Sequence, residues 1–176
     1  YETKSCGGSA ANTIIGMAKL GLKTGYIGKV GNDSNGKMMQ DYLESHNVDT
    51  THLIKGNGET GEVIGFVDSS GDRKLYVTPK INDTISNSEI KRDYIKNTKL
   101  LHLTSFVGLN PEDPSIDTQM ELLDELKDDV IVSFDPGMLY VNKGLDFMNK
   151  LISYTDILLI NETELLLTTN KKTLQE

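Results

Sequence analysis

The runs Leu100-Leu-His-Leu-Thr104, Val130-Ile-Val-Ser-Phe134 and Asp156-Ile-Leu-Leu-Ile160 decide the fold class of this sequence. Each run has the length and the aliphatic content of a buried strand. Apolar residues at helical spacing separate the runs, over residues 116–126 and 144–154. Short apolar strands that alternate with amphipathic helices are typical of βαβ units. The sequence therefore predicts an α/β fold with a mostly parallel sheet and flanking helices.

The amino-terminal half continues this alternation. A buried helix is predicted from Ser9 to Leu20, and Gly21 is placed to end it in the left-handed conformation. A strand over residues 25–30 follows, after which Asp33 or Ser34 caps an amphipathic helix. Between Thr60 and Thr78 two β-rich runs surround a turn, which predicts a hairpin that projects from the main sheet. A polar helix is predicted over residues 86–97.

Composition narrows the classes of protein. The 176 residues have a formal net charge of −8 and only two arginines, which argues against nucleic acid as a partner. The longest apolar runs fall far below the roughly 18 residues of a membrane span, so no membrane partner is expected. Cys6 is the only cysteine, which excludes an intrachain disulfide and favours the cytoplasm. The length fits one domain, or part of a larger one.

Polar residues follow the predicted strands. In parallel sheets ligands bind outside the carboxyl ends of the strands, which here lead into Gly31–Ser34, Ser105–Phe106, Asp135–Gly137 and Asn161–Glu164. A ligand site is therefore expected at this edge. Asp135 either turns the chain or binds a substrate hydroxyl, and its sequence context leaves both open.

The segment Gly7-Gly8-Ser-Ala-Ala-Asn12 opens the first predicted helix. Two glycines let the backbone approach a ligand closely, the first amide groups of a helix attract oxygen atoms, and Asn12 offers a donor and an acceptor. This chemistry suits a polyhydroxyl ligand. The alternative is a tight turn with Asn12 satisfied inside the helix.

Two further motifs are ambiguous. Carboxylates in Asn161-Glu-Thr-Glu164 most commonly complement a helix dipole, but Glu164 or Glu162 there can also hold the water shell of Mg²⁺ beside phosphates. The run from Gly31 to Lys37 resembles a P-loop, yet the next residue is Met38, which has no hydroxyl for Mg²⁺. A capped turn between strand and helix fits this run better.

Four motifs in chain order resemble those of the ribokinase-like (PfkB) family of carbohydrate and nucleoside kinases. They are Gly7-Gly8-x-Ala10-x-Asn12 followed by Gly21 and Gly31, the run from Tyr26 to Asp33 with Gly36, Thr60-Gly61, and Asn161-x-x-Glu164. The resemblance covers essentially the whole chain. It implies a Rossmann-like, mostly parallel sheet with flanking helices and a small β lid, formed by residues 60–78 together with a strand near residues 1–6.

The resemblance also implies a reaction and a site. The reaction is ATP-dependent phosphorylation of a hydroxymethyl group of a sugar or nucleoside, with ATP and Mg²⁺ as cofactors and a lid that closes over the substrate. The implied substrate-binding residues are Gly7, Gly8, Asn12, Ser105 and Asp135. Asn161 and Glu164 would lie near the phosphates, with Glu164 at the metal. A homodimer through the lid is a further expectation, because exposed strand edges pair readily.

Three positions depart from the family pattern. Ile14 replaces a small residue, while Ser9 and Ser105 stand where ribokinases proper usually carry Lys and Glu, which argues against ribose as the substrate. The run Gly7-Gly8-Ser9 is closer to adenosine-kinase-like members. The family's Gly-Ala-Gly-Asp run, which supplies the catalytic Asp and the anion hole, does not occur in residues 1–176.

Residues 1–176 are thus expected to be the amino-terminal part of a kinase, inactive alone, with the catalytic Asp beyond Glu176 and the first strand before Tyr1. Asp135 occupies a different family position and is not that base. The alternatives are a non-catalytic α/β protein that binds a small ligand, and a P-loop NTPase that would need Lys37 to bind phosphate.

Overall fold

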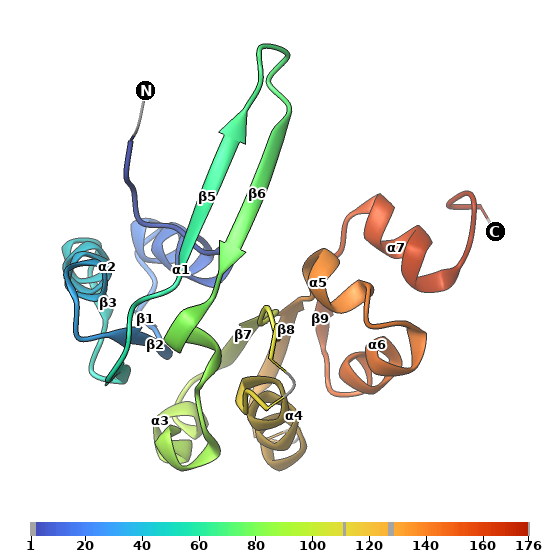
Figure 1. Ribbon diagram of the computed structural model, residues 1–176. Coiled ribbons are helices and arrows are strands. Elements are labelled where there is room, and N and C mark those ends of the chain that lie inside the picture. Colours follow the sequence, from blue (N-terminus) through green and yellow to red (C-terminus); the bar gives the residue numbers. More distant parts are fainter. Residues whose placement is uncertain (1–2, 111, 127–128, 176) are drawn as a thin grey trace. The chain divides into compact units, whose positions relative to one another are not determined.

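The computed structural model describes residues 3–110, 112–126 and 129–175. It confirms an α/β fold with parallel strand pairs and several helices (Figure 1). The chain forms two compact units. Unit 1 comprises Tyr1–Glu89 and Val107–Pro114, and unit 2 comprises Ile90–Phe106 and Ser115–Glu176. No helix in the described ranges is long and apolar enough to cross a membrane.

Unit 1 begins with two helices over short parallel strand pairs. Its elements are α1 (Ser9–Lys19), β1 (Thr24–Gly25), β2 (Gly28–Gly31), α2 (Ser34–Ser45), β3 (Val48–Asp49), β4 (Leu53–Gly56), β5 (Glu62–Val67), β6 (Arg73–Thr78) and the 3-10 helices η1 (Lys80–Asp83) and η2 (Asn87–Glu89). Strand β1 pairs with β3, and β2 pairs with β4, both in parallel. The buried Ala11, Ile15, Leu43 and Val48 form a core between the helices and these strands.

The predicted strand over residues 25–30 is wrong in one respect, because it is two strands. The chain changes pairing partner at Tyr26 and Ile27, since β1 lies beside β3 whereas β2 lies beside β4. The predicted end of α1 is confirmed, since Gly21 has φ of +87°. Asp33 is confirmed as the N-cap of α2.

The polar helix predicted over residues 86–97 is also wrong, because this stretch contains two short helices, η2 and α3 (Arg92–Lys96). The Glu89 carboxylate binds the Lys29 ammonium at 2.9 Å and accepts from the Ser86 amide at 2.9 Å. Ile95, by contrast, is buried in unit 2. The two halves of the stretch thus belong to different units, and the two residues between them, Ile90 and Lys91, are not helical.

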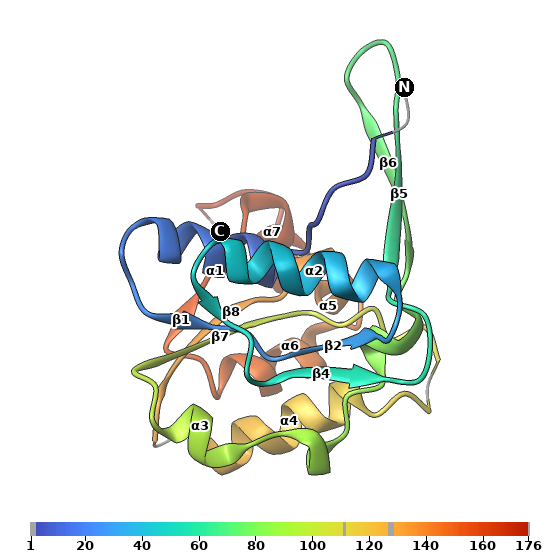
Figure 2. The same cartoon turned by 90° about the vertical axis from the view of Figure 1, so that its left-hand side faces the viewer.

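The predicted hairpin is present as the antiparallel strands β5 and β6, with Val63 opposite Val77. The Asp68 amide donates to the Asp72 carbonyl at 3.0 Å and closes the turn. Every residue of both strands is exposed, and the hairpin projects from unit 1 (Figures 1 and 2). Residues 3–6 are not in a strand, in contrast to the predicted lid strand over residues 1–6, because they pair with no neighbouring strand. Residues 1 and 2 lie outside the described residues.

Unit 2 contains a three-stranded parallel sheet in the order β7-β8-β9. After α3 its elements are β7 (Leu100–Thr104), α4 (Ser115–Leu126), β8 (Ile131–Asp135), α5 (Gly137–Val141), α6 (Leu145–Ile152), β9 (Ile157–Leu158) and α7 (Glu162–Thr169). All three predicted strands are confirmed. The core side chains of this unit include Leu123, Leu126, Val132, Phe134, Tyr140, Met148 and Leu151.

Candidate functional site

The amino end of α1 is open to solvent. Gly8 is the N-cap with φ of +112°, a conformation that favours glycine, and a Cβ added to Gly7 would have no neighbouring atom within 4 Å. The Asn12 amide donates to the Gly8 carbonyl at 2.9 Å, and Asn12 itself is exposed. Because residues four apart share a helix face, the Asn12 side chain lies one turn from Gly8. The exposed Asn12 carboxamide therefore lies within one helical turn of the backbone amides at the open end of α1.

In unit 2, the predicted residues lie at one edge of the sheet. Thr104 is opposite Asp135 in the β7–β8 pair, and Phe134 is opposite Leu158 in the β8–β9 pair. Because the strands are parallel, their carboxyl ends meet there, followed by Ser105 and Asn161. The Ser105 hydroxyl lies 3.5 Å from where a Cβ on Gly137 would stand.

The candidate residues divide between the two units. Unit 1 contains Gly7, Gly8 and Asn12, whereas unit 2 contains Ser105, Asp135, Asn161 and Glu164. Within each unit the candidates lie close together. The structure thus brings the polar residues of unit 2 together at the strand ends, as predicted, and their binding of a ligand stays a prediction.

Asn161 and Glu164 form a capping box at the start of α7. The Asn161 side chain accepts from the Glu164 amide at 3.0 Å, and the Glu164 carboxylate accepts from the Asn161 amide at 3.2 Å. Glu164 is buried. One oxygen of the Glu164 carboxylate is already engaged by the Asn161 amide. A single carboxylate of this kind suits contact with the water shell of Mg²⁺ better than direct coordination of the ion by several protein ligands. Within the described ranges, no group of three or more His, Cys, Asp or Glu side chains is arranged to hold a metal.

His102 on β7 belongs to none of the motifs that the sequence offers. Its Nδ1 atom lies 3.1 Å from the Ser133 hydroxyl on β8, while its buried Nε2 atom has no hydrogen-bond partner among the described residues. Burial lowers the pKa of His102, and the charge of Asp135 opposes this shift. Burial therefore favours the neutral form of the His102 imidazole.

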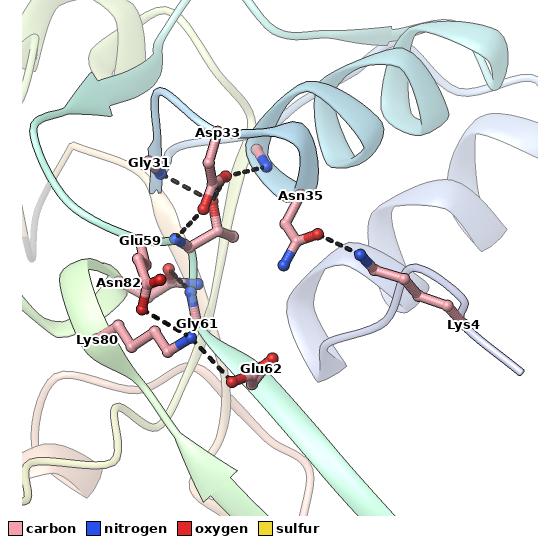
Figure 3. Close-up of polar contacts among 11 residues, drawn as sticks. Lys4, Gly31, Asp33, Asn35, Glu59, Gly61, Glu62, Lys80 and Asn82 are labelled. Carbon is pink, nitrogen blue, oxygen red and sulfur yellow. Dashed lines mark hydrogen bonds and ion pairs between the residues drawn. The ribbon is translucent and has the colours of Figure 1, made fainter. Parts of the chain in front are cut away.

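A dense group of hydrogen bonds joins the start of α2 to the base of the hairpin (Figure 3). The Asp33 carboxylate accepts from the Gly36 amide at 2.7 Å, from the Thr60 hydroxyl at 2.6 Å and from the Thr60 amide at 2.8 Å. These hydrogen bonds, with those from Thr60 first, lower the pKa of Asp33 to about 2. The Thr60 hydroxyl in turn accepts from the Gly31 amide at 2.9 Å.

The base of the hairpin has a second set of contacts on η1. The Gly61 amide donates to the Asn82 side chain at 2.7 Å. Lys80, with φ of +49°, forms ion pairs with Glu59 at 3.1 Å and with Glu62 at 2.8 Å (Figure 3). Both strands of the hairpin are therefore held at their inner ends.

The contacts of Asp33 also show how the P-loop-like run from Gly31 to Lys37 is folded. The Asp33 side chain caps α2, as predicted for a capped turn. The Lys37 ammonium forms an ion pair with Asp41 at 2.9 Å, one turn later on the same helix. The interpretation as a capped turn is confirmed, and nothing in the geometry favours a phosphate cradle at Lys37.

The fold and the motifs define the class of protein, a ribokinase-like α/β protein. Residues 2–176 match the model of the pfkB family carbohydrate kinases, and the chain belongs to this family. The resemblance seen in the sequence is thereby confirmed.

Individual relatives agree with this assignment. The chain is 40% identical over 151 residues to an uncharacterized sugar kinase of Archaeoglobus fulgidus, a match that covers 86% of this chain and 59% of the relative. It is 33% identical over 146 residues to a 5-dehydro-2-deoxygluconokinase of Listeria innocua, covering 76% and 42%. The chain thus spans about half the length of the relatives it matches, 59% of the first and 42% of the second.

A solved structure shares the fold. The crystal structure of an uncharacterized sugar kinase from Pyrococcus horikoshii superposes with a TM-score of 0.81 at 27% identity, over 93% of this chain and 56% of that one. The same protein has been solved in complex with ATP, where the TM-score is 0.80 and the identity 26%.

Proposed function

We propose that the protein is an ATP-dependent kinase that phosphorylates a hydroxymethyl group of a sugar or nucleoside, and that this chain carries the sugar-binding part. The observation that carries the proposal is the open amino end of α1. There, Gly7, Gly8 and the exposed Asn12 present amides and a carboxamide to solvent, as a polyhydroxyl ligand requires. Family membership supports the same conclusion.

The strand ends of unit 2 supply the remaining polar groups in this proposal. Ser105 and Asp135 bind substrate hydroxyls, the serine as donor or acceptor and the carboxylate as acceptor. Asp135 is not the catalytic base in this proposal, because it matches a different position of the family pattern, at the end of a middle strand. A general base is an Asp elsewhere in the protein, which takes the proton of the attacking hydroxyl.

ATP is the phosphoryl donor in this proposal, supported by the ATP complex of the Pyrococcus horikoshii relative. Asn161 and Glu164 lie near the phosphates, with the Glu164 carboxylate accepting hydrogen bonds from the waters of Mg²⁺. When bound, Mg²⁺ neutralises charge that develops on the transferred phosphoryl group. The protein itself positions the two substrates and excludes water.

The hairpin acts as a lid in this proposal, and it also contacts a second copy of the chain. Its strands expose apolar side chains on both faces, which a single substrate molecule cannot cover. We also place the protein in the cytoplasm, in agreement with its free Cys6.

Residues 1–176 contain no Gly-Ala-Gly-Asp run. We therefore propose that a polypeptide of these residues binds the sugar but transfers no phosphoryl group. Turnover of Mg-ATP by that polypeptide with any sugar would contradict this part of the proposal.

The test uses a panel of pentoses, hexoses and nucleosides with Mg-ATP, with ADP and phosphorylated product measured together. Asn12→Ala should raise the KM of the accepted substrate about tenfold or more, because a buried hydrogen-bonded hydroxyl loses its partner. Asn149→Ala is the matched control, since Asn149 is an exposed asparagine on α6. Sugar binding without any ADP formation by the full-length protein, as opposed to a polypeptide of residues 1–176 alone, would instead favour a non-catalytic binding protein.

A further inference from the structure

The Asp33 carboxylate makes more contacts than a helix cap needs. An N-cap side chain usually accepts one hydrogen bond from the first turn of its helix, which Asp33 does with the Gly36 amide. Both additional bonds come from Thr60, whose amide and hydroxyl donate to the two carboxylate oxygens. We call Asp33, Thr60 and the amides of Gly31 and Gly36 the hairpin latch.

The backbone segments that form the hairpin latch lie very close to one another. A Cβ on Gly31 would lie 2.1 Å from the Gly58 carbonyl oxygen, and a Cβ on Gly36 would lie 2.1 Å from the Gly31 carbonyl oxygen. Thr60 is 6% exposed, so its hydroxyl is desolvated and both of its hydrogen bonds are needed. The start of α2 and the segment before β5 therefore fit together in one arrangement.

Apart from the latch, the base of the hairpin near Thr60 is held by the Gly61–Asn82 hydrogen bond and the ion pairs of Lys80, and not by packing on a core. All residues of β5 and β6 are exposed, so neither face packs on a core. A two-stranded ribbon without such packing is marginal by itself. Only Gly61 separates Thr60 from the first residue of β5, so a constraint on Thr60 is passed directly to the strand.

We infer that Asp33 is a positioning residue, which fixes the inner end of β5 so that the hairpin moves only beyond Thr60. In the kinase proposed above, on which this functional consequence rests, Asp33 thereby sets where the hairpin closes over the sugar. The second contact set, between Gly61 and Asn82, holds the next residue of the same segment. Asp33 does not itself touch substrate in this scheme.

The first test is amide hydrogen exchange of the protein, which requires no activity. Thr60→Val has nearly the same shape but lacks the hydroxyl that links Gly31 to Asp33. It should speed exchange at residues 60–62 and in β5 about tenfold or more, whereas the amides of β7 and β8 in unit 2 stay unchanged. Thr60→Ser keeps the hydroxyl and should restore slow exchange.

Asp33→Asn provides a second variant, because its amide nitrogen cannot accept the hydrogen bonds that one carboxylate oxygen receives. Asp41→Asn is its control, an exposed carboxylate on the same helix that pairs with Lys37. Unchanged exchange at residues 60–62 in both folded latch variants would overturn the inference. If Asp33→Asn fails to fold, the exchange rates of the Thr60→Val variant alone decide whether the inference holds.

The second test asks whether the latch matters for closure. A lid that closes in the wrong place admits water, so the latch variants should form more ADP than phosphorylated sugar, with a raised KM for the sugar. A purely structural role would leave one ADP per product molecule. If the unaltered protein phosphorylates no sugar, the proposed function fails, while the exchange experiment still decides whether Asp33 fixes the hairpin.

Discussion

Asn161 and Glu164 satisfy each other's backbone amides at the start of α7, at 3.0 and 3.2 Å. This reciprocal contact stabilises the helix by itself, without any ligand. The Asn-x-x-Glu motif therefore carries a structural role in addition to the proposed role at the phosphates. A substitution that simply removes Glu164 confounds the two roles, so the informative variants are those that keep the capping box.

Glu164→Gln separates these roles, because glutamine also completes a capping box but carries no charge. The variant should unfold at nearly the same denaturant concentration as the unaltered protein, yet need several-fold more Mg²⁺ for half-maximal kinase activity. Asn161→Ala, in contrast, loses the cap and should lower the free energy of unfolding by about 1 kcal/mol. An unchanged Mg²⁺ dependence in Glu164→Gln would restrict Glu164 to capping.

The latch geometry predicts opposite effects of the same substitution at two helical glycines. Gly36→Ala places a Cβ 2.1 Å from the Gly31 carbonyl oxygen and should cost about 1–3 kcal/mol of unfolding free energy. Gly16→Ala lies in the middle of α1 with nothing within 4 Å, and should stabilise by about 0.5–1 kcal/mol. Denaturant unfolding measures both. A stabilised Gly36→Ala would show that the close approach at the latch is not obligatory.

Much of this arrangement follows from local sequence. The three strands of unit 2 are apolar runs with clear boundaries, and Asp33 is a cap residue in front of an amphipathic helix. The hairpin is evident because two β-rich runs flank a turn rich in Asp, Ser and Gly. In each case neighbouring residues alone determine the element, so periodicity and capping preferences suffice.

The contacts between distant residues could not be predicted in this way. Asp33 and Thr60 are 27 positions apart, and nothing in either local pattern indicates that they share two hydrogen bonds. The buried Asp83 accepts from the Gly108 amide at 2.6 Å, which ties residues 107–114 to unit 1. Burial raises the pKa of Asp83. Such pairs depend on how the chain folds back on itself.

The latch should also make Asp33 a determinant of acid stability. Its pKa is about 2 in the folded protein against an ordinary value of 3.8, so the native state favours the ionised form. The resulting stabilisation is fully present above pH 4 and is lost as the pH falls through about 2. Asp33→Asn lacks this component, so its stability should fall less between pH 5 and pH 2.

Urea unfolding of both proteins at a series of pH values measures the difference. Other carboxylates with lowered pKa values, Glu44, Asp68, Glu89 and Glu125, contribute equally to both proteins and cancel in the comparison. Asp41→Asn should follow the unaltered protein. Parallel curves for the unaltered protein and Asp33→Asn would contradict an ionised, hydrogen-bonded Asp33.

The exposed hairpin is expected to mediate self-association of the protein. Phe66 is 62% exposed and meets the Tyr76 ring edge-on at 5.7 Å, on a ribbon whose neighbouring aliphatic side chains are also exposed. Aromatic residues contribute strongly to protein interfaces, so Phe66→Ser should raise the dissociation constant of the proposed homodimer at least tenfold. Sedimentation velocity over a concentration series measures it. Leu20→Ser, at an 83% exposed position outside the hairpin, should have no effect. A concentration of about 100 µM lies well above the Kd of a stable complex. If the unaltered protein stays monomeric at this concentration, the homodimer is refuted and the hairpin keeps only its proposed role as a lid.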